Sequence, residues 1–147
     1  MKIINQTSSG GIVFKRNENC KLKIENFLWL ITQHSQHKGW VFPKGLVGDK
    51  DSKESMEKAA LREVEEEGGI KAKIVNEKPI KTHYQYRLGG DLIKKTVFYF
   101  LMEYLRGDPK NHDWEMMNAK FVTTEEVRKT LTYKSDKEAF EKILKQL

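Results

Sequence analysis

Residues Gly45–Ile70 read GLVGDKDSKESMEKAALREVEEEGGI and end in a dense run of carboxylates. The pattern predicts a helix over Met56–Gly68. With 100° between successive residues, Glu63, Glu66 and Glu67 fall within an arc of about 100° on such a helix. Like charges at this spacing repel by about 0.2–0.5 kcal/mol per close pair. Three carboxylates on one helical face therefore call for an explanation.

The residues themselves leave two explanations open. A hard divalent cation such as Mg²⁺ takes oxygen ligands and would turn the repulsion into attraction. The alternative is an acidic helix face that only contacts solvent. Cleavage of a phosphoanhydride needs charge neutralisation, a deprotonated water and an in-line geometry. Clustered carboxylates beside the guanidinium of Arg62 would supply these parts.

Length and composition restrict the class of protein. The chain has 147 residues, of which 38% are hydrophobic, which is enough for one domain over residues 1–147. No apolar run approaches the ~20 residues that span a bilayer, and the first residues lack the apolar stretch of a signal peptide. Cys20 is the one cysteine, so an intramolecular disulfide is excluded and a cytoplasmic location is expected. The net charge of +6 suits a polyanionic partner but also serves solubility alone.

Strands and helices alternate in a pattern typical of an α+β fold. Seven segments rich in β-branched and aromatic residues predict strands: Ser9–Lys15, Phe27–Gln33, Trp40–Phe42, Lys73–Val75, His83–Leu88, Leu92–Leu105 and Ala119–Val122. Turns are predicted at Asn17–Asn19 and Gly89-Gly90, and a loop at Pro43–Gly45.

The helices have recognisable start and stop signals. Ser55 is a candidate N-cap for the helix over Met56–Gly68, and the glycine pair at 68–69 would end it. Two capping boxes follow, Thr123 with Glu126 and Ser135 with Glu138. The second predicts a C-terminal helix through Leu147, whose buried side would be Ala139, Phe140, Ile143, Leu144 and Leu147.

The stretch 45–70 resembles the Nudix box, a glycine and a spaced glutamate followed by R-E-U-x-E-E-x-G-U with U aliphatic. The matching positions are Arg62, Glu63, Val64, Glu66, Glu67, Gly69 and Ile70. The family leaves five residues between its first glycine and the glutamate, whereas eight separate Gly45 from Glu54 here. Counting forward from Gly45 selects Asp51, and counting back from Arg62 selects Glu54. Because the helix is the rigid part, Glu54 is preferred.

The resemblance implies a mixed sheet sandwiched between helices, with the box as a catalytic loop–helix–loop. It also implies a hydrolase of nucleoside diphosphates linked to another group, which uses Mg²⁺ or Mn²⁺. Glu63, Glu66, Glu67 and the backbone carbonyl near Gly45 would ligate the metal. Arg62 would hold a glutamate in place, and Glu54 would be a supporting acid. Glu66 and Glu115 both remain candidates for the general base.

The box is followed in order by His83–Tyr86, Lys95–Phe100, His112–Glu115 and Leu131–Lys134. This order is similar to that of asymmetric dinucleoside tetraphosphate (Ap4A) hydrolases, which split Ap4A into ATP and AMP. That similarity implies that Tyr84 or Tyr86 stacks on an adenine together with Tyr133. It also implies phosphate contacts for Lys44, Lys95 and Lys137. His34 and His37 flank the Trp40 loop and are candidates for the same kind of contact. Each of these residues has an ordinary alternative as a core, rim or surface side chain. Glu115 could equally be a solvent-exposed acid.

Other functions remain open. A Nudix enzyme could act instead on RNA 5′ ends, inositol pyrophosphates or oxidised dNTPs, because the box is common to all of them. A nucleotide sensor that binds without turnover and a basic nucleic-acid-binding module are alternatives of another class. The sequence favours a hydrolase that binds a nucleoside polyphosphate, without a membrane or a stable nucleic-acid partner, as a monomer or homodimer.

Overall fold

The computed structural model describes residues 1–16, 26–48 and 52–147. Its elements are β1 (Ile3–Arg16), β2 (Phe27–His34), β3 (Trp40–Val41), β4 (Lys44–Leu46), α1 (Met56–Gly68), β5 (Ile70–Ile74), β6 (Ile80–Leu88), β7 (Asp91–Gly107), the short 3₁₀ helix η2 (Pro109–Asn111), β8 (Met116–Thr123), α2 (Thr124–Thr130) and α3 (Lys134–Leu144). The predicted turn at 17–19, Cys20 and Asp51 lie outside the described residues.

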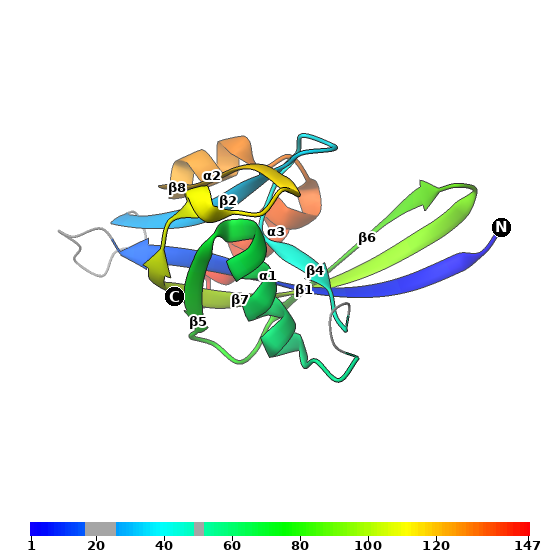
Figure 1. The fold of residues 1–147 in the computed structure, drawn as a ribbon, viewed down its shortest axis with the longest axis horizontal. Coiled ribbons are helices and arrows are strands. Elements are labelled where there is room, and N and C mark those ends of the chain that lie inside the picture. Colours follow the sequence, from blue (N-terminus) through cyan, green and yellow to red (C-terminus); the bar gives the residue numbers. More distant parts are fainter. Residues whose placement is uncertain (17–25, 49–51) are drawn as a thin grey trace.

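A mixed sheet forms the centre of the molecule (Figure 1). Its main path is β3-β2-β1-β7-β5, while β4 pairs with β1, β6 with β7 and β8 with β2. β1 and β7 run parallel, and the other pairs of described strands are antiparallel. This architecture confirms the predicted α+β fold with a mixed sheet.

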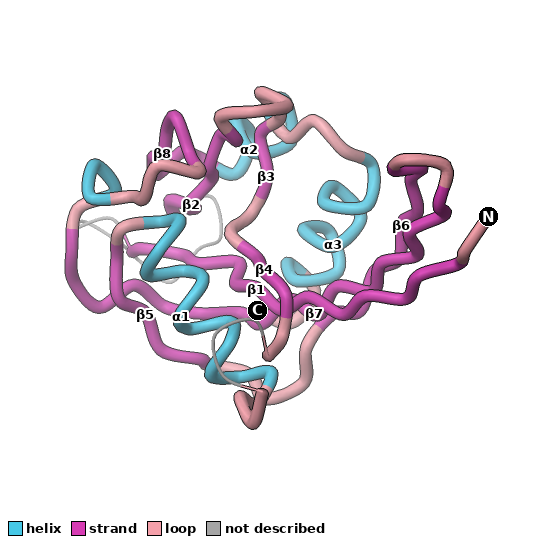
Figure 2. The backbone as a smooth tube through the Cα atoms, turned by 45° about the vertical axis from the view of Figure 1, so that its right-hand side comes forward, coloured by secondary structure: helices cyan, strands magenta, loops and turns pink. Residues whose placement is uncertain are grey.

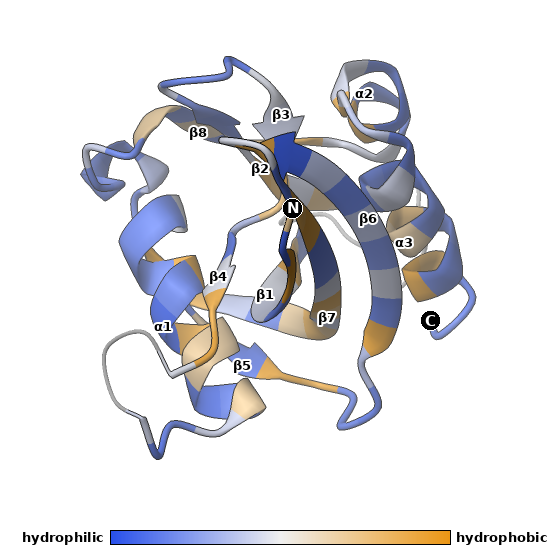
Figure 3. Cartoon of the chain, turned by 90° about the vertical axis from the view of Figure 1, so that its right-hand side faces the viewer, coloured by the Kyte–Doolittle hydropathy of each residue, from blue (hydrophilic) through white to orange (hydrophobic). Residues whose placement is uncertain are grey.

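Helices cover both faces of the sheet, which confirms the predicted sandwich. Seen from its end in Figure 3, the sheet has α1 on one side and α2 and α3 on the other. Alternate residues of a strand point to opposite faces, so the sheet serves two cores. Val13 and Phe100 pack with Val64 of α1, whereas Trp29 packs with Phe140 of α3. The prediction that Trp29 lies in the core is confirmed, because it is 0% exposed.

Two hydrogen bonds connect the second core to its helices. Trp29 Nε1 donates to Thr124 Oγ1 at 2.9 Å, and the buried Tyr99 hydroxyl donates to Asp136 Oδ1 of α3 at 2.7 Å. Burial without these partners would cost each polar group a desolvation penalty of about 1–3 kcal/mol. The second bond fixes the start of α3 against the sheet.

β1, β6 and β7 continue beyond the helices as a three-stranded arm (Figures 1 and 2). We define the arm as residues 3–7 of β1, 82–88 of β6 and 91–96 of β7, and the N-terminus lies near its tip. The sequence predicts β1 only from Ser9, because residues 3–8 are largely polar and carry no strand signal of their own. Their parallel pairing with β7 supplies the structure. Hydrophilic residues dominate β6 in Figure 3.

Three local predictions need correction. Lys44 and Gly45 form β4 with Leu46, rather than a loop, because this segment pairs with β1. The second capping box is wrong: α3 begins at Lys134 after Tyr133, and no side chain caps it. Leu147 lies beyond the end of α3 and is 45% exposed, so it is not part of the buried side. The first capping box, at Thr123 and Glu126, is confirmed.

The burial of the predicted Phe98 and Phe100 stripe is uneven. Phe100 is fully buried, whereas Phe98 is half-buried and the Lys81 ammonium lies 5.8 Å from the centre of its ring. In the described part of the chain no helix is long and apolar enough to cross a membrane.

Candidate functional site

Helix α1 is held rigidly at both ends. The Ser55 hydroxyl accepts a hydrogen bond from the Lys58 backbone N–H at 3.2 Å, and Gly69 closes the helix in the left-handed conformation with φ of 73°. Both features were predicted. Ala60 and Val64 are buried against the sheet. Because the apolar stripe fixes the rotation of the helix, the carboxylates on the neighbouring face point toward β4 and the loop before β8.

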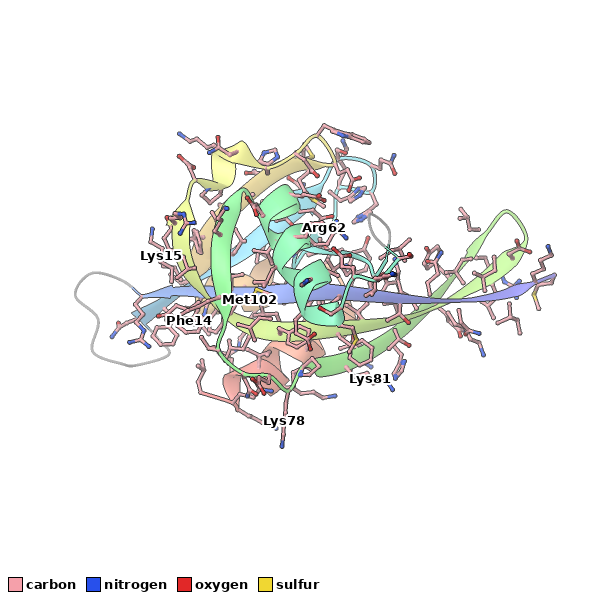
Figure 4. All side chains as sticks on the ribbon, turned by 60° about the horizontal axis from the view of Figure 1, so that its bottom comes forward. Phe14, Lys15, Arg62, Lys78, Lys81 and Met102 are labelled. Atoms are coloured by element: carbon pink, nitrogen blue, oxygen red, sulfur yellow. The ribbon has the colours of Figure 1, made fainter. Side chains whose placement is uncertain are left out.

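Arg62, which is labelled on α1 in Figure 4, binds three carboxylates with one guanidinium. Its Nε and Nη2 atoms contact the two oxygens of Glu54 at 2.7 and 3.0 Å. Nη1 contacts Glu63 Oε1 at 2.7 Å and Glu66 Oε2 at 3.2 Å. The hydrogen bond from Arg62 holds the pKa of Glu54 below its usual value, and the contact with Glu54 raises the pKa of Arg62. Glu54, the residue chosen by counting back from the helix, is thus the two-point partner of Arg62.

Glu63 and Glu67 are buried against β4, each only 5% exposed. The Lys44 backbone N–H donates to Glu67 Oε1 at 3.1 Å. A Cβ atom on Gly45 would overlap the carboxyl group of Glu63. The pairing of Ser9 with Gly45 places β4 beside α1, and the absence of a side chain at Gly45 lets the Glu63 carboxyl approach the backbone.

The negative charges of Glu63 and Glu67 are poorly compensated because both side chains are buried. Desolvation raises the pKa of Glu67 to about 9, with the charge of Glu63 acting in the same direction and the Lys44 N–H against it. Desolvation also raises the pKa of Glu63, although Arg62 opposes the shift. Negative charge at Glu115 raises both. The site therefore concentrates negative charge that the described protein groups do not fully neutralise.

Glu115 reaches this cluster from the loop before β8. The loop is tied to α1 because the Asp113 N–H donates to the Glu66 backbone oxygen at 2.8 Å. The Asp113 carboxylate in turn accepts from the Glu115 N–H at 3.1 Å. On the other side, the Ser35 N–H and hydroxyl both donate to the Glu115 carbonyl, at 2.9 and 2.8 Å. Four bonds thus position an acid that lies far from the box in sequence.

The carboxylates fit a hard divalent cation by their chemistry. Among the described residues, no three Asp, Glu, His or Cys side chains lie close enough together to hold a metal ion as they stand. The donors are nevertheless oxygen atoms, buried and mutually repulsive, which is the environment that Mg²⁺ or Mn²⁺ stabilises. The raised pKa of Glu67, which burial causes, agrees with this preference for a nearby positive charge.

An aromatic cluster lies on the α3 side of the sheet. The rings of Tyr84 and Tyr86 are 6.2 Å apart and inclined by 23°. The Tyr133 hydroxyl lies 3.0 Å from His37 Nδ1, and His37 stacks on His34 with 4.3 Å between ring centres. Burial raises the pKa of Tyr84, with smaller contributions from Asp136, Tyr86 and Tyr133. Tyr84 also interacts electrostatically with Tyr133, so the Tyr84 and Tyr86 pair lies near the group formed by Tyr133, His37 and His34.

Two lysines connect the aromatic cluster with the carboxylates. Lys95 stands opposite Tyr84 in the register, and its pKa is lowered by burial and by the charge of Lys44, while Glu67 opposes this shift. The pKa of His37 is lowered by burial, then by His34 and Lys44. The carboxylates, the cations and the aromatic rings therefore act on one another electrostatically across one region of the structure. Their chemistry is of the kind that a metal ion, a phosphate chain and a nucleobase require.

Lys137 does not lie in this region. Together with Arg128, Leu131, Phe140 and Glu141, it lines a groove of about 220 Å³ between α2 and α3. A helix advances 100° per residue, so when Asp136 faces the sheet, Lys137 is turned away from it.

Two residues at the site were not selected from the sequence. They are Tyr99 and Asp136. Tyr99 sits in an apolar strand that predicts only core, and Asp136 follows a serine that resembles a cap. The signal that points to Asp136 is an acidic residue in the first turn of a predicted helix. His34 and His37 flank the Trp40 loop together and the sequence favours neither, whereas in the structure it is His37 that contacts the Tyr133 hydroxyl.

Comparison with known proteins places this geometry in context. The NUDIX domain family matches residues 8–143. The mutator protein MutT4 of Mycobacterium tuberculosis (strain CDC 1551 / Oshkosh) is 25% identical over 138 residues, which is 93% of this chain and 54% of the relative. The chain thus spans about half the length of that curated relative.

Solved structures share the fold. The Ap4A hydrolase of C. elegans, in a binary complex, superposes with a TM-score of 0.70 at 21% identity and covers 96% of both chains. The NUDIX domain of Shewanella oneidensis NrtR, complexed with ADP ribose, gives 0.68 at 15% identity, covering 97% of this chain and 88% of that one. The MutT protein of Methanosarcina mazei Go1 gives 0.65 at 21% identity, covering 99% and 97%.

Proposed function

The chain belongs to the NUDIX domain family, and from that premise we propose that it hydrolyses nucleoside polyphosphates with the help of a divalent metal. The observation that carries the proposal is the hydrogen bond from the Lys44 N–H to Glu67. The charges of Glu63 and Glu115 also act on Glu67, and Lys95 interacts electrostatically with both Lys44 and Glu67. Negative groups would hold a cation, and the neighbouring lysines would hold phosphate oxygens. A hydrolase of this class attacks phosphorus with water and breaks a phosphoanhydride bond.

Glu63, Glu66, Glu67 and the Gly45 carbonyl are the groups that would hold Mg²⁺ or Mn²⁺. When bound, the metal would neutralise phosphate charge and acidify water. Arg62 would orient the box by fixing Glu54 and Glu63. Glu66 or Glu115 would accept the proton from water. Glu66 is the more accessible box carboxylate, with 36% of its side chain exposed and a longer 3.2 Å contact to Arg62.

The aromatic cluster supports a substrate with a nucleobase. Tyr84 or Tyr86 and Tyr133 would stack on the base, and His34 would lie at its edge beside the phosphates. The fold likeness to the C. elegans Ap4A hydrolase supports Ap4A as the substrate, cleaved to ATP and AMP. Oxidised dNTPs, RNA 5′ ends and inositol pyrophosphates remain the alternative substrates, because the box is common to the enzymes that act on them. Lys137 would meet phosphate only where a substrate extends beyond α3. A cytoplasmic location is part of this proposal.

The test is a substrate panel with purified protein. Ap4A, RNA with a 5′ triphosphate, inositol pyrophosphates, 8-oxo-dGTP and ADP-ribose are each incubated with Mg²⁺, Mn²⁺ or EDTA, and products are separated by chromatography. We expect Ap4A to give ATP and AMP with the highest kcat/KM and no turnover in EDTA. Faster cleavage of another substrate would reject Ap4A. Binding without turnover of any substrate would instead indicate a sensor.

Replacing Tyr133 by Ala should raise KM for Ap4A by about 5–160-fold, because base–aromatic stacking is worth about 1–3 kcal/mol. The matched control is Tyr133→Phe, which keeps the ring and removes only the hydroxyl contact with His37. We expect its KM to stay within about threefold of the wild type. Initial-rate kinetics at saturating Mg²⁺ measure both variants. An unchanged KM in Tyr133→Ala would mean that this ring does not hold the base.

A further inference from the structure

The arm has a second face that the proposed active site does not use. Residues that pair across strands share a face, and successive residues alternate. Tyr84 pairs with Lys95, and both belong to the face that carries the aromatic cluster. Gln85 pairs with Lys94, and Lys94 pairs with Asn5, so these three residues point to the opposite face. We call this opposite face the far face of the arm.

The far face is the continuation of the surface on which α1 packs. The Ser9 hydroxyl donates to the Met56 carbonyl in the first turn of α1, at 2.7 Å. Asn5 lies four residues closer to the N-terminus on the same side of β1 and is exposed. The N-terminal part of β1 extends beyond α1 (Figure 1). The sheet therefore continues past its covering helix.

An open cavity of about 410 Å³ lies on this far face. Asn5, His83, Gln85, Lys94 and Thr96 line it, and it reaches the strands at Tyr84 and Lys95, whose side chains leave on the other face. His83 Nδ1 and Thr96 Oγ1 are 3.2 Å apart and satisfy one another. The other three polar far-face side chains that line the cavity, Asn5, Gln85 and Lys94, are therefore the ones that could bind a ligand.

Asn5, Gln85 and Lys94 have no side-chain hydrogen bond or ion pair to any described residue. Two amides and an ammonium provide several N–H donors directed at one volume. No carboxylate of the described residues lines the cavity. The other charged residues at far-face positions of β6 are Lys81 and Arg87, both cationic. The charged side chains at the described far-face positions of these strands are therefore all cationic.

We propose that the far face of the arm is a second site, which binds a chain of linked phosphates without cleaving it. Its chemistry matches such a ligand in two ways: N–H donors meet the terminal oxygens, and Lys81 and Arg87 extend the positive charge along β6. Side chains two residues apart on one strand face are about 6.6 Å apart, so the donors follow an extended anion rather than one point charge. The box carboxylates lie beside β4, whose Gly45 pairs with Ser9 of β1, four residues away from Asn5 along the strand, so no hydrolysis is expected here.

The test is a titration of the whole protein with tripolyphosphate in EDTA, followed by nuclear magnetic resonance of the side-chain amides. We expect the resonances of Asn5 and Gln85 to shift saturably. Lys94→Glu should weaken this binding at least about tenfold, because it replaces an attractive charge by a repulsive one. It should leave kcat/KM for Ap4A within about twofold, because Lys94 faces away from the aromatic cluster.

Lys95→Glu is the matched control, since the same charge change is made one residue away on the opposite face. It should lower Ap4A hydrolysis and leave the Asn5 and Gln85 shifts in place. If Lys94→Glu fails to fold, the double variant Asn5→Ala/Gln85→Ala replaces it, with affinity measured by calorimetry. A parallel titration with ATP identifies the source of the phosphate chain: equal affinity indicates a free polyphosphate, and tighter ATP binding indicates a nucleotide.

Two results would overturn the proposal. One is that shifts remain confined to residues near Lys44 and Lys95, with Asn5 and Gln85 unaffected at millimolar tripolyphosphate. The other is that Lys94→Glu binds as tightly as the wild type. Either result would mean that the positive charge of the far face serves solubility and does not bind a phosphate chain.

Discussion

Glu66→Gln is expected to lower kcat for nucleotide hydrolysis at least about a hundredfold, equivalent to about 2.7 kcal/mol of transition-state stabilisation. The amide keeps the shape of the side chain but removes the charge and the basicity that a metal ligand or proton acceptor needs. Folding should be unaffected. The bond that Glu66 makes to the loop before β8 uses its backbone oxygen, which accepts from the Asp113 N–H. Steady-state kinetics and a urea unfolding curve measure the two quantities.

Glu65→Gln is the matched control because it lies one residue away on the same helix. Glu65 points to solvent, with 55% of its side chain exposed, and its ion pair with Lys71 is 3.6 Å long. Exposed pairs of this kind contribute about 0–1 kcal/mol. We expect kcat within about twofold of the wild type. Equal losses in both variants would mean that helix charge in general, rather than the box face, supports turnover.

The part of the site predicted from the sequence is the part made by local interactions. The periodicity of 3.6 residues, the Ser55 cap and the Gly69 stop determine α1 and the rotation of Glu63 and Glu67. The local geometry of a helix sets the direction of its side chains, whatever the rest of the chain does. The same reason explains why Arg62 and Glu54 could be matched by counting: Glu54 lies just before the helix start.

The parts that the sequence did not predict depend on distant partners. The start of α3 is set by Thr132, whose hydroxyl accepts from the Trp40 N–H at 2.9 Å and whose own N–H donates to the Trp40 carbonyl. This tie to β3 outweighs a side-chain cap, so the helix begins at Lys134 instead of after Ser135. Local capping preference is worth about 1 kcal/mol and yields to tertiary contacts.

The arm illustrates the same limit at larger scale. Asn5 and Thr7 are polar residues in a segment without strand alternation, and only pairing with Lys94 and Thr96 of β7 makes them a strand. Strand preference depends strongly on context, so such pairing leaves little trace in a single segment. The sequence predicted a strand over Leu92–Leu105, but no local signal indicated that residues 3–8 would pair with it.

β4 brings the box carboxylates and the aromatic cluster together. Lys44 donates its backbone N–H to Glu67 while its charge acts on His37 and Lys95. The three-residue strand β4 thus links α1 to the aromatic side of the sheet. Because Ser8–Gly10 of β1 pair with this strand, the sheet positions both parts of the site at once.

Glu67→Gln is expected to abolish most turnover and, without metal, to stabilise the fold. The pKa of Glu67 in the folded protein is about 9, above the 4.5 of an ordinary glutamate. The folded state therefore holds a proton that the unfolded chain releases. Stability from this group is full below pH about 4.5 and declines as pH rises toward 9. The neutral amide escapes that decline, so we expect the variant to gain about 1–3 kcal/mol at pH 8 in EDTA.

Urea unfolding at pH 5 and pH 8 measures this gain. The wild type should lose stability between the two pH values more steeply than Glu67→Gln, and Glu65→Gln should follow the wild type because its carboxylate is exposed. Adding Mg²⁺ should reverse the order at pH 8, since a cation that binds only the folded wild-type site raises its stability by mass action. If Glu67→Gln were less stable than the wild type in EDTA, the buried Glu67 carboxylate would not destabilise the fold. Its burial and its repulsion by Glu63 could then not explain why this site attracts a metal.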